Sequence, residues 1–77
     1  MSEASFTVDW HALILDEIAD KRMTRNVVAE TYAILIAKRH DDWRPINLAI
    51  MARWSPSALE YIKARAWKRA NELVRAA

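Results

Sequence analysis

The chain of 77 residues contains no glycine. Small strand-rich domains need glycine in their tight turns, because glycine adopts positive backbone φ angles at little cost. Alanine, leucine, isoleucine, arginine and lysine are abundant instead, and these residues favour helices. We therefore expect an all-α protein of one domain, with residues 8–77 forming the helical domain and residues 1–7 a flexible N-terminal arm.

The chain also lacks cysteine, so no disulfide or thiolate metal site can stabilise it. A domain of this size buries only about 60% of its unfolded surface. Hydrophobic residues make up 53% of the sequence and include four tryptophans. We expect Trp54 and Trp67 in the core, and Trp10 and Trp43 at its two ends.

Helical periodicity appears first in the N-terminal half. Over residues 9–22 apolar side chains recur every four positions, and Asp9 or Thr7 can cap the start. Over residues 25–39 Thr24 is a suitable cap. The apolar stripe of this second helix is broad, which predicts that the helix packs on two sides.

Two proline-containing breaks separate the remaining helices. After "HDDWRP", Asp42 is the expected N-cap of a third helix with Pro45 in its first turn. After "WSPS", Ser55 or Ser57 is the expected cap of a fourth helix, which continues to about Val74. The sequence thus predicts a small four-helix domain.

Charge is unevenly distributed along the chain. Residues 1–35 carry three basic and six acidic residues, a net charge of −3, whereas residues 36–77 carry nine basic and four acidic residues, a net charge of +5. Such a chain can present its C-terminal half to a polyanion. The alternative is that the basic residues only solvate a helix surface, and the charge by itself does not separate the two.

The stretch "NLAIMARWSPSALEYIKAR" resembles the helix-turn-helix motif of DNA-binding proteins. Ala49 matches the small residue of the motif's first helix, Trp54 and Ser55 match its turn, and Leu59 and Ile62 match two buried positions of its second helix. "WSPSALEYI" is similar to the turn and the start of the recognition helix in many small bacterial, phage and plasmid regulators. The resemblance covers about residues 46–70 and implies a helix-turn-helix formed by the third and fourth helices.

One position departs from the family pattern. Arg53 stands where members of the family often have glycine with a positive φ. The resemblance therefore implies a positive φ at Arg53, or a longer and more open turn.

A helical wheel divides the fourth helix into two faces. The expected buried stripe comprises Leu59, Ile62, Ala66, Trp67, Ala70, Leu73 and Val74. The expected exposed face comprises Ser57, Tyr61, Ala64, Arg65, Lys68 and Arg75. Basic residues attract phosphates, and short side chains let a helix enter the major groove, so the exposed face has the composition of a recognition helix.

The helix-turn-helix interpretation assigns residues to roles. Candidates for contacts with base edges are Ser55, Ser57, Glu60, Tyr61 and Arg65. Candidates for contacts with phosphates are Arg44, Arg53, Lys63, Lys68 and Arg69. In this interpretation the protein is a transcriptional regulator or accessory factor that binds double-stranded DNA, with the fourth helix in the major groove. We expect a homodimer formed through the acidic N-terminal half.

A second hypothesis is a helical protein-interaction module that binds or inhibits a partner protein without contacting nucleic acid. The four tryptophans, the broad stripe of the second helix and the modest net charge of +2 favour it.

Catalysis has little support in the sequence. His11 and His40 are the only histidines, and neither belongs to a spaced metal-binding pair. Asp41 and Asp42 could bind a divalent ion beside His40, but a capped loop explains them more simply. We expect no enzymatic activity, no cofactor and no metal. We also expect no membrane association and a cytoplasmic location, because no apolar run approaches the length of a membrane span and the first ten residues lack the pattern of a secretion signal.

Overall fold

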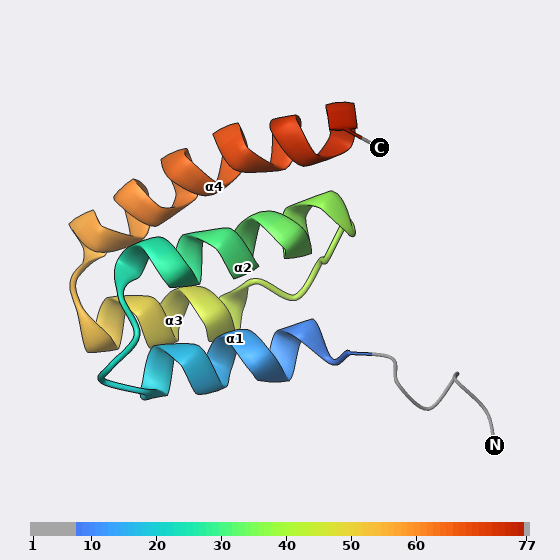
Figure 1. Cartoon of the computed structure of the whole chain (residues 1–77). Helices are drawn as coiled ribbons and strands as arrows, with labels where there is room; N and C mark the ends of the chain where they lie inside the picture. The colour runs from blue at the N-terminus through green and yellow to red at the C-terminus, as the bar shows by residue number, and fades with distance from the viewer. Residues whose placement is uncertain (1–7, 77) are drawn as a thin grey trace, which may run out of the picture.

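The computed structural model describes residues 8–76, so the expected arm over residues 1–7 lies outside the described residues. Four helices follow one another, α1 (Trp10–Ala19), α2 (Arg25–Ala37), α3 (Arg44–Arg53) and α4 (Pro56–Ala76) (Figure 1). No strand occurs within residues 8–76. The all-α class and the four helices predicted from the sequence are confirmed.

Three of the four helices begin with the predicted caps. Asp9 accepts a hydrogen bond from the Ala12 amide at 3.0 Å, and Thr24 accepts one from the Val27 amide at 3.2 Å. Of the two serines considered for α4, Ser55 is the cap, because its Oγ accepts from the Ala58 amide at 3.1 Å. These side chains satisfy amide groups that a helix start leaves without partners.

The predicted cap of α3 is wrong. Trp43, not Asp42, occupies the N-cap position, and no side-chain hydrogen bond caps the helix. Pro45 lies in the first turn and has no amide hydrogen, so there is one fewer group for a cap to satisfy. Trp43 instead stacks on Tyr32 of α2, with 4.4 Å between the ring centroids. A contact between helices therefore fixes the start of α3.

Helix α1 ends at Ala19, three residues before the predicted end. The Asp20 carboxylate accepts hydrogen bonds from the backbone amide of Arg22 at 3.0 Å and from its guanidinium at 3.0 and 3.1 Å. These bonds hold the pKa of Asp20 below its usual value. A local bond of this kind competes with the continuation of a helix.

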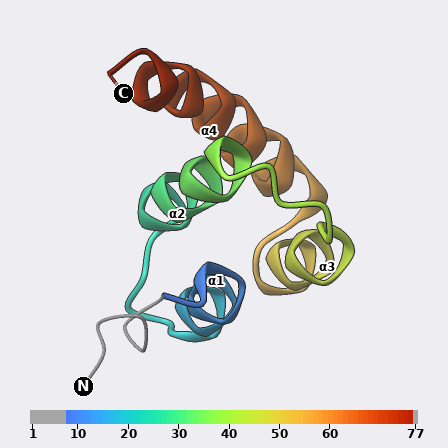
Figure 2. The same cartoon turned by 90° about the vertical axis from the view of Figure 1, so that its right-hand side faces the viewer.

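The four helices are arranged with α1 and α4 on opposite sides of the molecule and α2 and α3 between them (Figure 2). Helix α2 packs against α1 and, most extensively, against α4, as its broad apolar stripe predicts. Helix α3 also contacts both α1 and α4, whereas α1 and α4 share no contact within the described part of the chain. The acidic helix α1 and the basic helix α4 consequently lie on opposite sides of the molecule.

One hydrophobic core joins the four helices. Its larger buried side chains are Ile14, Ile18, Val28, Tyr32, Leu35, Ile46, Ile50, Leu59 and Ile62. Buried alanines on α2 and α4 (Ala29, Ala33, Ala66 and Ala70) leave room for these two helices to approach closely. Trp10, Trp43 and Trp54 are partly buried against the core.

The chain leaves α2 through a Schellman motif. Arg39 has a φ of 61°, its amide donates to the Ile36 carbonyl at 2.9 Å, and the His40 amide donates to the Leu35 carbonyl at 3.0 Å. Arg39 is the one residue among the described positions with a positive φ. The positive φ expected at Arg53 is therefore wrong, because Arg53 is the last residue of α3 and no left-handed residue follows it in the link to α4.

Candidate functional site

Helix α4 buries a narrower stripe than the wheel predicts. Ile62, Ala66 and Ala70 are buried with Leu59, in agreement with the prediction. The prediction of burial is wrong for Trp67 and Val74, whose side chains are 54% and 62% exposed. Only α2 and α3 cover α4, and they leave the flank that carries these two residues open.

The outward face of α4 agrees with the prediction. The exposed residues on this face include Ser57, Tyr61, Ala64, Arg65, Lys68 and Arg75. Arg65 and Lys68 form no ion pair with any described residue. Two exposed cations therefore project from the middle of the helix, close to the small side chain of Ala64.

Three of the other residues expected at base edges, Ser55, Glu60 and Tyr61, already have partners. Ser55 uses its Oγ as the cap, and this atom lies 3.0 Å from the Ser57 Oγ. Glu60 lies 3.9 Å from the Lys63 ammonium, a loose pair at the surface. The Tyr61 hydroxyl donates to Asn26 of α2 at 2.7 Å.

Arg25 joins this region from α2. Its guanidinium lies over the Tyr61 ring, 5.7 Å from the centroid, and Arg25 itself is exposed. Arg25 could not be identified from the sequence, since nothing local indicates that the start of α2 lies beside a residue 36 positions away. The structure thus adds a cation at the edge of the outward face.

Of the residues expected at phosphates, Arg53 is held by the fold. Its guanidinium donates to the carbonyls of Ile18 and Lys21 at 3.1 Å and of Met23 at 3.0 Å, with a longer contact of 3.5 Å to Glu17. It also lies over the Trp54 ring at 4.1 Å. Arg53 thus caps the C-terminal end of α1, where the helix dipole favours a cation.

Arg69 and Lys63 also form ion pairs within the protein, whereas Arg44 and Lys68 are exposed and form none with a described residue. Arg69 donates to Glu72 and Glu30 at 3.1 Å each, and these two carboxylates raise the pKa of its guanidinium. Lys63 lies half-buried on the opposite flank of α4 from Arg65. Arg44 is exposed at the first position of α3.

A shallow hollow of about 200 Å³ lies along the basic flank of α4. It is lined by Arg65, Lys68, Arg69 and Glu72. Three cationic side chains therefore surround the hollow with one carboxylate, and that carboxylate is already bonded to Arg69. The arrangement can accept an anionic oxygen without displacing a contact of Arg65 or Lys68.

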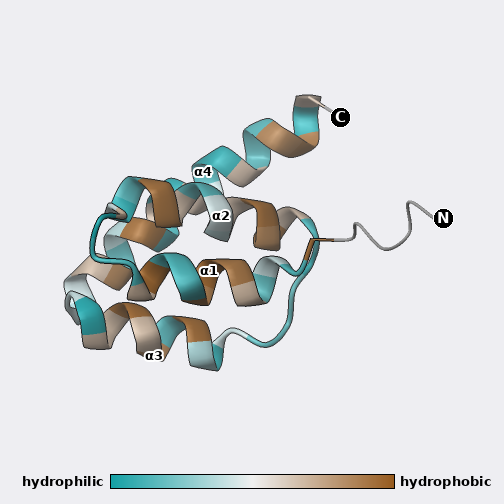
Figure 3. Ribbon diagram, turned by 60° about the horizontal axis from the view of Figure 1, so that its bottom comes forward, coloured by the Kyte–Doolittle hydropathy of each residue, from teal (hydrophilic) through white to brown (hydrophobic). Residues whose placement is uncertain are grey.

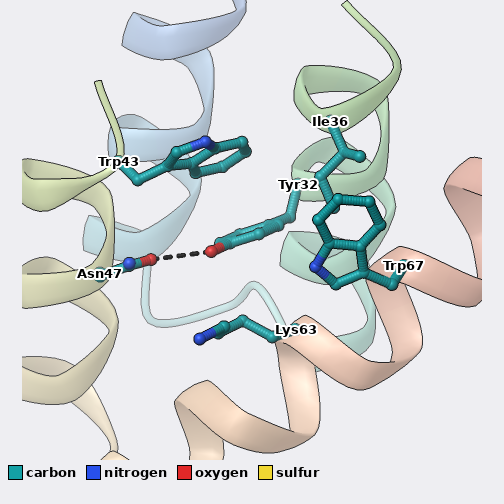
Figure 4. Close-up of a pocket in the computed structure, with 6 residues that line it drawn as sticks. All are labelled: Tyr32, Ile36, Trp43, Asn47, Lys63 and Trp67. Atoms are coloured by element: carbon teal, nitrogen blue, oxygen red, sulfur yellow. Dashed lines mark hydrogen bonds between the residues drawn. The ribbon is translucent and has the colours of Figure 1, made fainter. Parts of the chain in front are cut away.

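A second concave site, which the sequence analysis did not anticipate, lies on the other flank of α4 (Figure 4). Its volume is about 300 Å³, and its lining residues are Tyr32, Ile36, Trp43, Asn47, Lys63 and Trp67. We call it the aromatic cleft. An exposed Trp67 is the feature that would have indicated this cleft. The helical wheel assigned Trp67 to the core, so the cleft was not predicted.

A third concave site is a groove of about 620 Å³ between α1 and α3, which lie side by side in Figure 3. It is lined by Leu15, Ile18, Ala19, Lys21, Ala49, Ala52 and Arg53. We call it the α1/α3 groove. Most of its lining is apolar, and it lies on the side of the molecule away from α4.

The two histidines meet across the N-terminal end of α1. His11 Nδ1 lies 3.0 Å from His40 Nε2, and the same His40 nitrogen lies 3.0 Å from the Asp42 carbonyl oxygen. Within residues 8–76 no group of three or more histidine, aspartate or glutamate side chains is placed to hold a metal ion.

Comparison with protein-family models, curated proteins and solved structures finds no match to this chain. The helix-turn-helix resemblance is therefore supported only by the residues of the motif itself. In the described part of the chain, no helix has the length and apolar character needed to cross a membrane.

Proposed function

We propose that the protein binds double-stranded DNA through the outward face of α4. The observation that carries this proposal is the pair of exposed cations Arg65 and Lys68, which lack ion-pair partners among the described residues and border a hollow of about 200 Å³. Small residues on the same face, Ser57 and Ala64, allow close approach of the helix to a groove. A role as a transcriptional regulator or accessory factor follows from the same proposal.

The contacts of the side chains support a smaller set of DNA-binding residues than the sequence indicated. Lys68 and Arg25 are assigned to phosphates, and Ser57 and Arg65 to base edges. Tyr61 positions Arg25 through the contact of its ring, in addition to any contact with DNA. Arg53 and Arg69 are omitted, because each would have to give up hydrogen bonds within the protein.

The test is a fluorescence-anisotropy titration of labelled duplexes at several salt concentrations. Each phosphate contact adds about 0.9 to the slope of log affinity against log salt. Lys68→Ala should lower the slope by about one and weaken binding to all duplexes alike. Arg65→Ala should cost about 1–3 kcal/mol on a preferred duplex and relax the preference at one position.

Lys38→Ala is the matched control, because Lys38 is an exposed lysine at the C-cap of α2 and forms no ion pair with any described residue. All three variants should melt like the wild type. Wild-type binding that does not respond to salt, or a Lys38→Ala variant that loses as much slope as Lys68→Ala, would overturn the proposal.

We further propose that the protein binds DNA as a homodimer that pairs through α1. Helix α1 lies on the side away from α4, so pairing there leaves both α4 faces free. Sedimentation equilibrium should show a dimer at the concentrations that saturate DNA. A monomer bound to DNA with a stoichiometry of one per site would contradict the pairing.

A protein-interaction module is the second candidate function. The α1/α3 groove favours it, because this hollow of about 620 Å³ has a largely apolar lining, and α3 also exposes Leu48. In this alternative the groove binds a partner protein and α4 contacts no nucleic acid. Salt separates the two candidates, since a largely apolar interface responds weakly to ionic strength whereas phosphate contacts respond steeply.

A further inference from the structure

The aromatic cleft has walls suited to a flat ring. Trp43 stacks on one face of Tyr32 at 4.4 Å with 25° between the ring planes. In Figure 4, Lys63 lies on the other side of the Tyr32 ring from Trp43, and Trp67 lies beside Ile36 at one end of the cleft. Trp67 is 54% exposed, so a large apolar surface remains in water until something covers it.

The polar groups of the cleft are hydrogen-bond donors. Asn47 Oδ1 accepts from the Tyr32 hydroxyl at 2.9 Å, which leaves the amide NH₂ of Asn47 to donate. Burial raises the pKa of Tyr32 to about 12, so this hydroxyl stays protonated and keeps the amide in place. No described residue accepts a hydrogen bond from the Asn47 NH₂ or from the Trp67 indole N–H.

Lys63 gives the cleft a positive charge. Its ammonium is turned toward the cleft in Figure 4, and its side chain is 39% exposed. No carboxylate lines the cleft. Glu60 reaches Lys63 only at 3.9 Å and is itself 75% exposed, so this pair is a weak competitor for an anion.

We propose that the aromatic cleft binds a small aromatic carboxylate of one or two rings. The ring packs against the exposed side chain of Trp67, and the carboxylate accepts hydrogen bonds from Lys63 and from one of the two neutral donors. A cavity of about 150 Å³ holds benzene, so a cleft of about 300 Å³ accommodates a ring together with its carboxylate. The proposal does not depend on DNA binding, because Lys63 and Trp67 lie on the opposite flank of α4 from Arg65.

The test is a titration followed by the indole N–H signals in two-dimensional NMR, with the protein alone and no DNA. Trp67→Phe identifies the Trp67 signal. The probes are benzoate, benzamide and benzylamine, which share one ring and differ in the charge of the substituent. Benzoate should shift the Trp67 signal saturably, benzamide should bind more weakly, and benzylamine should bind weakest.

Three variants locate the binding. Lys63→Met keeps the aliphatic stem and should weaken benzoate binding about tenfold or more, because a hydrogen bond to a charged group is lost. Trp67→Ala removes the Trp67 signal itself, so binding to this variant is followed on the indole N–H of Trp43, which also lines the cleft, and most of the affinity should be lost. Lys38→Met, at an exposed lysine outside the cleft, should leave it unchanged.

The result that would overturn the proposal is the absence of a saturable shift with benzoate, or benzylamine binding as tightly as benzoate. Equal losses in Lys63→Met and Lys38→Met would also overturn it, because the effect would then be one of overall charge. Circular dichroism on each variant checks that the fold is intact. Trp67→Phe gives a second, conservative variant in which only the N–H donor and part of the ring are removed.

Discussion

We expect the replacement of Arg53 to lower the free energy of unfolding. Arg53→Met keeps an aliphatic side chain but removes the guanidinium that lies over Trp54, together with three hydrogen bonds of 3.0–3.1 Å to carbonyls at the end of α1 and in its link to α2. A hydrogen bond to a charged group contributes about 1.5–3 kcal/mol when its partner cannot turn to water. Two of the bonds are partly buried and the third is exposed. We therefore expect a net loss of about 2–4 kcal/mol.

Such a loss is large for a chain of this length, whose total stability is about 4–12 kcal/mol. The melting temperature should fall by roughly 8–30 °C. Urea denaturation followed by circular dichroism measures the change in unfolding free energy directly.

Arg44→Met is the control for this experiment, because Arg44 is exposed at the opposite end of α3 and forms no ion pair with a described residue. It should change the stability by less than about 0.5 kcal/mol. If Arg53→Met is no less stable than Arg44→Met, the capping of α1 by Arg53 contributes nothing and the reasoning is refuted.

Three further predictions concern stability. Arg39→Gly should stabilise the protein by about 0.5–1 kcal/mol, because glycine adopts the φ of 61° without strain, and an unchanged or lower urea midpoint would contradict this. Leu59→Ala should destabilise by about 2–5 kcal/mol, whereas Val74→Ala at an exposed position should change little; equal melting temperatures would show that α4 buries a different face. The pKa of Asp20 is lowered by its bonds to Arg22, so its contribution is present above the unfolded value of 3.8 and is lost as the pH falls through the lower folded value. Asp20→Asn should flatten that part of the stability–pH curve, and an unaltered curve would count against the Asp20 bonds.

Local signals in the sequence predicted the helices and most of their starts. Caps such as Asp9, Thr24 and Ser55 act on amides three residues away, so residue type and position are sufficient to identify them. The exposed position of Arg65 and Lys68 on α4 follows in the same way from helical periodicity.

Contacts between distant segments explain what the sequence did not predict. The wheel assigned Trp67 to the core because it treats all apolar residues near the stripe alike, and it holds no information on which flank α2 and α3 cover. Arg53 was assigned to a phosphate contact. Its actual partners are backbone carbonyls 30 or more positions away, which the local sequence cannot reveal. The aromatic cleft likewise depends on the stacking of Trp43, at the start of α3, on Tyr32 of α2.

The most direct test of the DNA-binding proposal is to map which residues contact DNA by NMR titration of the protein with a duplex. Backbone amide chemical shifts measured during titration with a duplex, at low salt, report which residues lie at the contact. The account predicts that the largest changes fall on Ser57, Ala64, Arg65 and Lys68 and at the start of α2, and that they diminish as salt is added. Changes centred on the α1/α3 groove, or no changes at any duplex concentration, would contradict it.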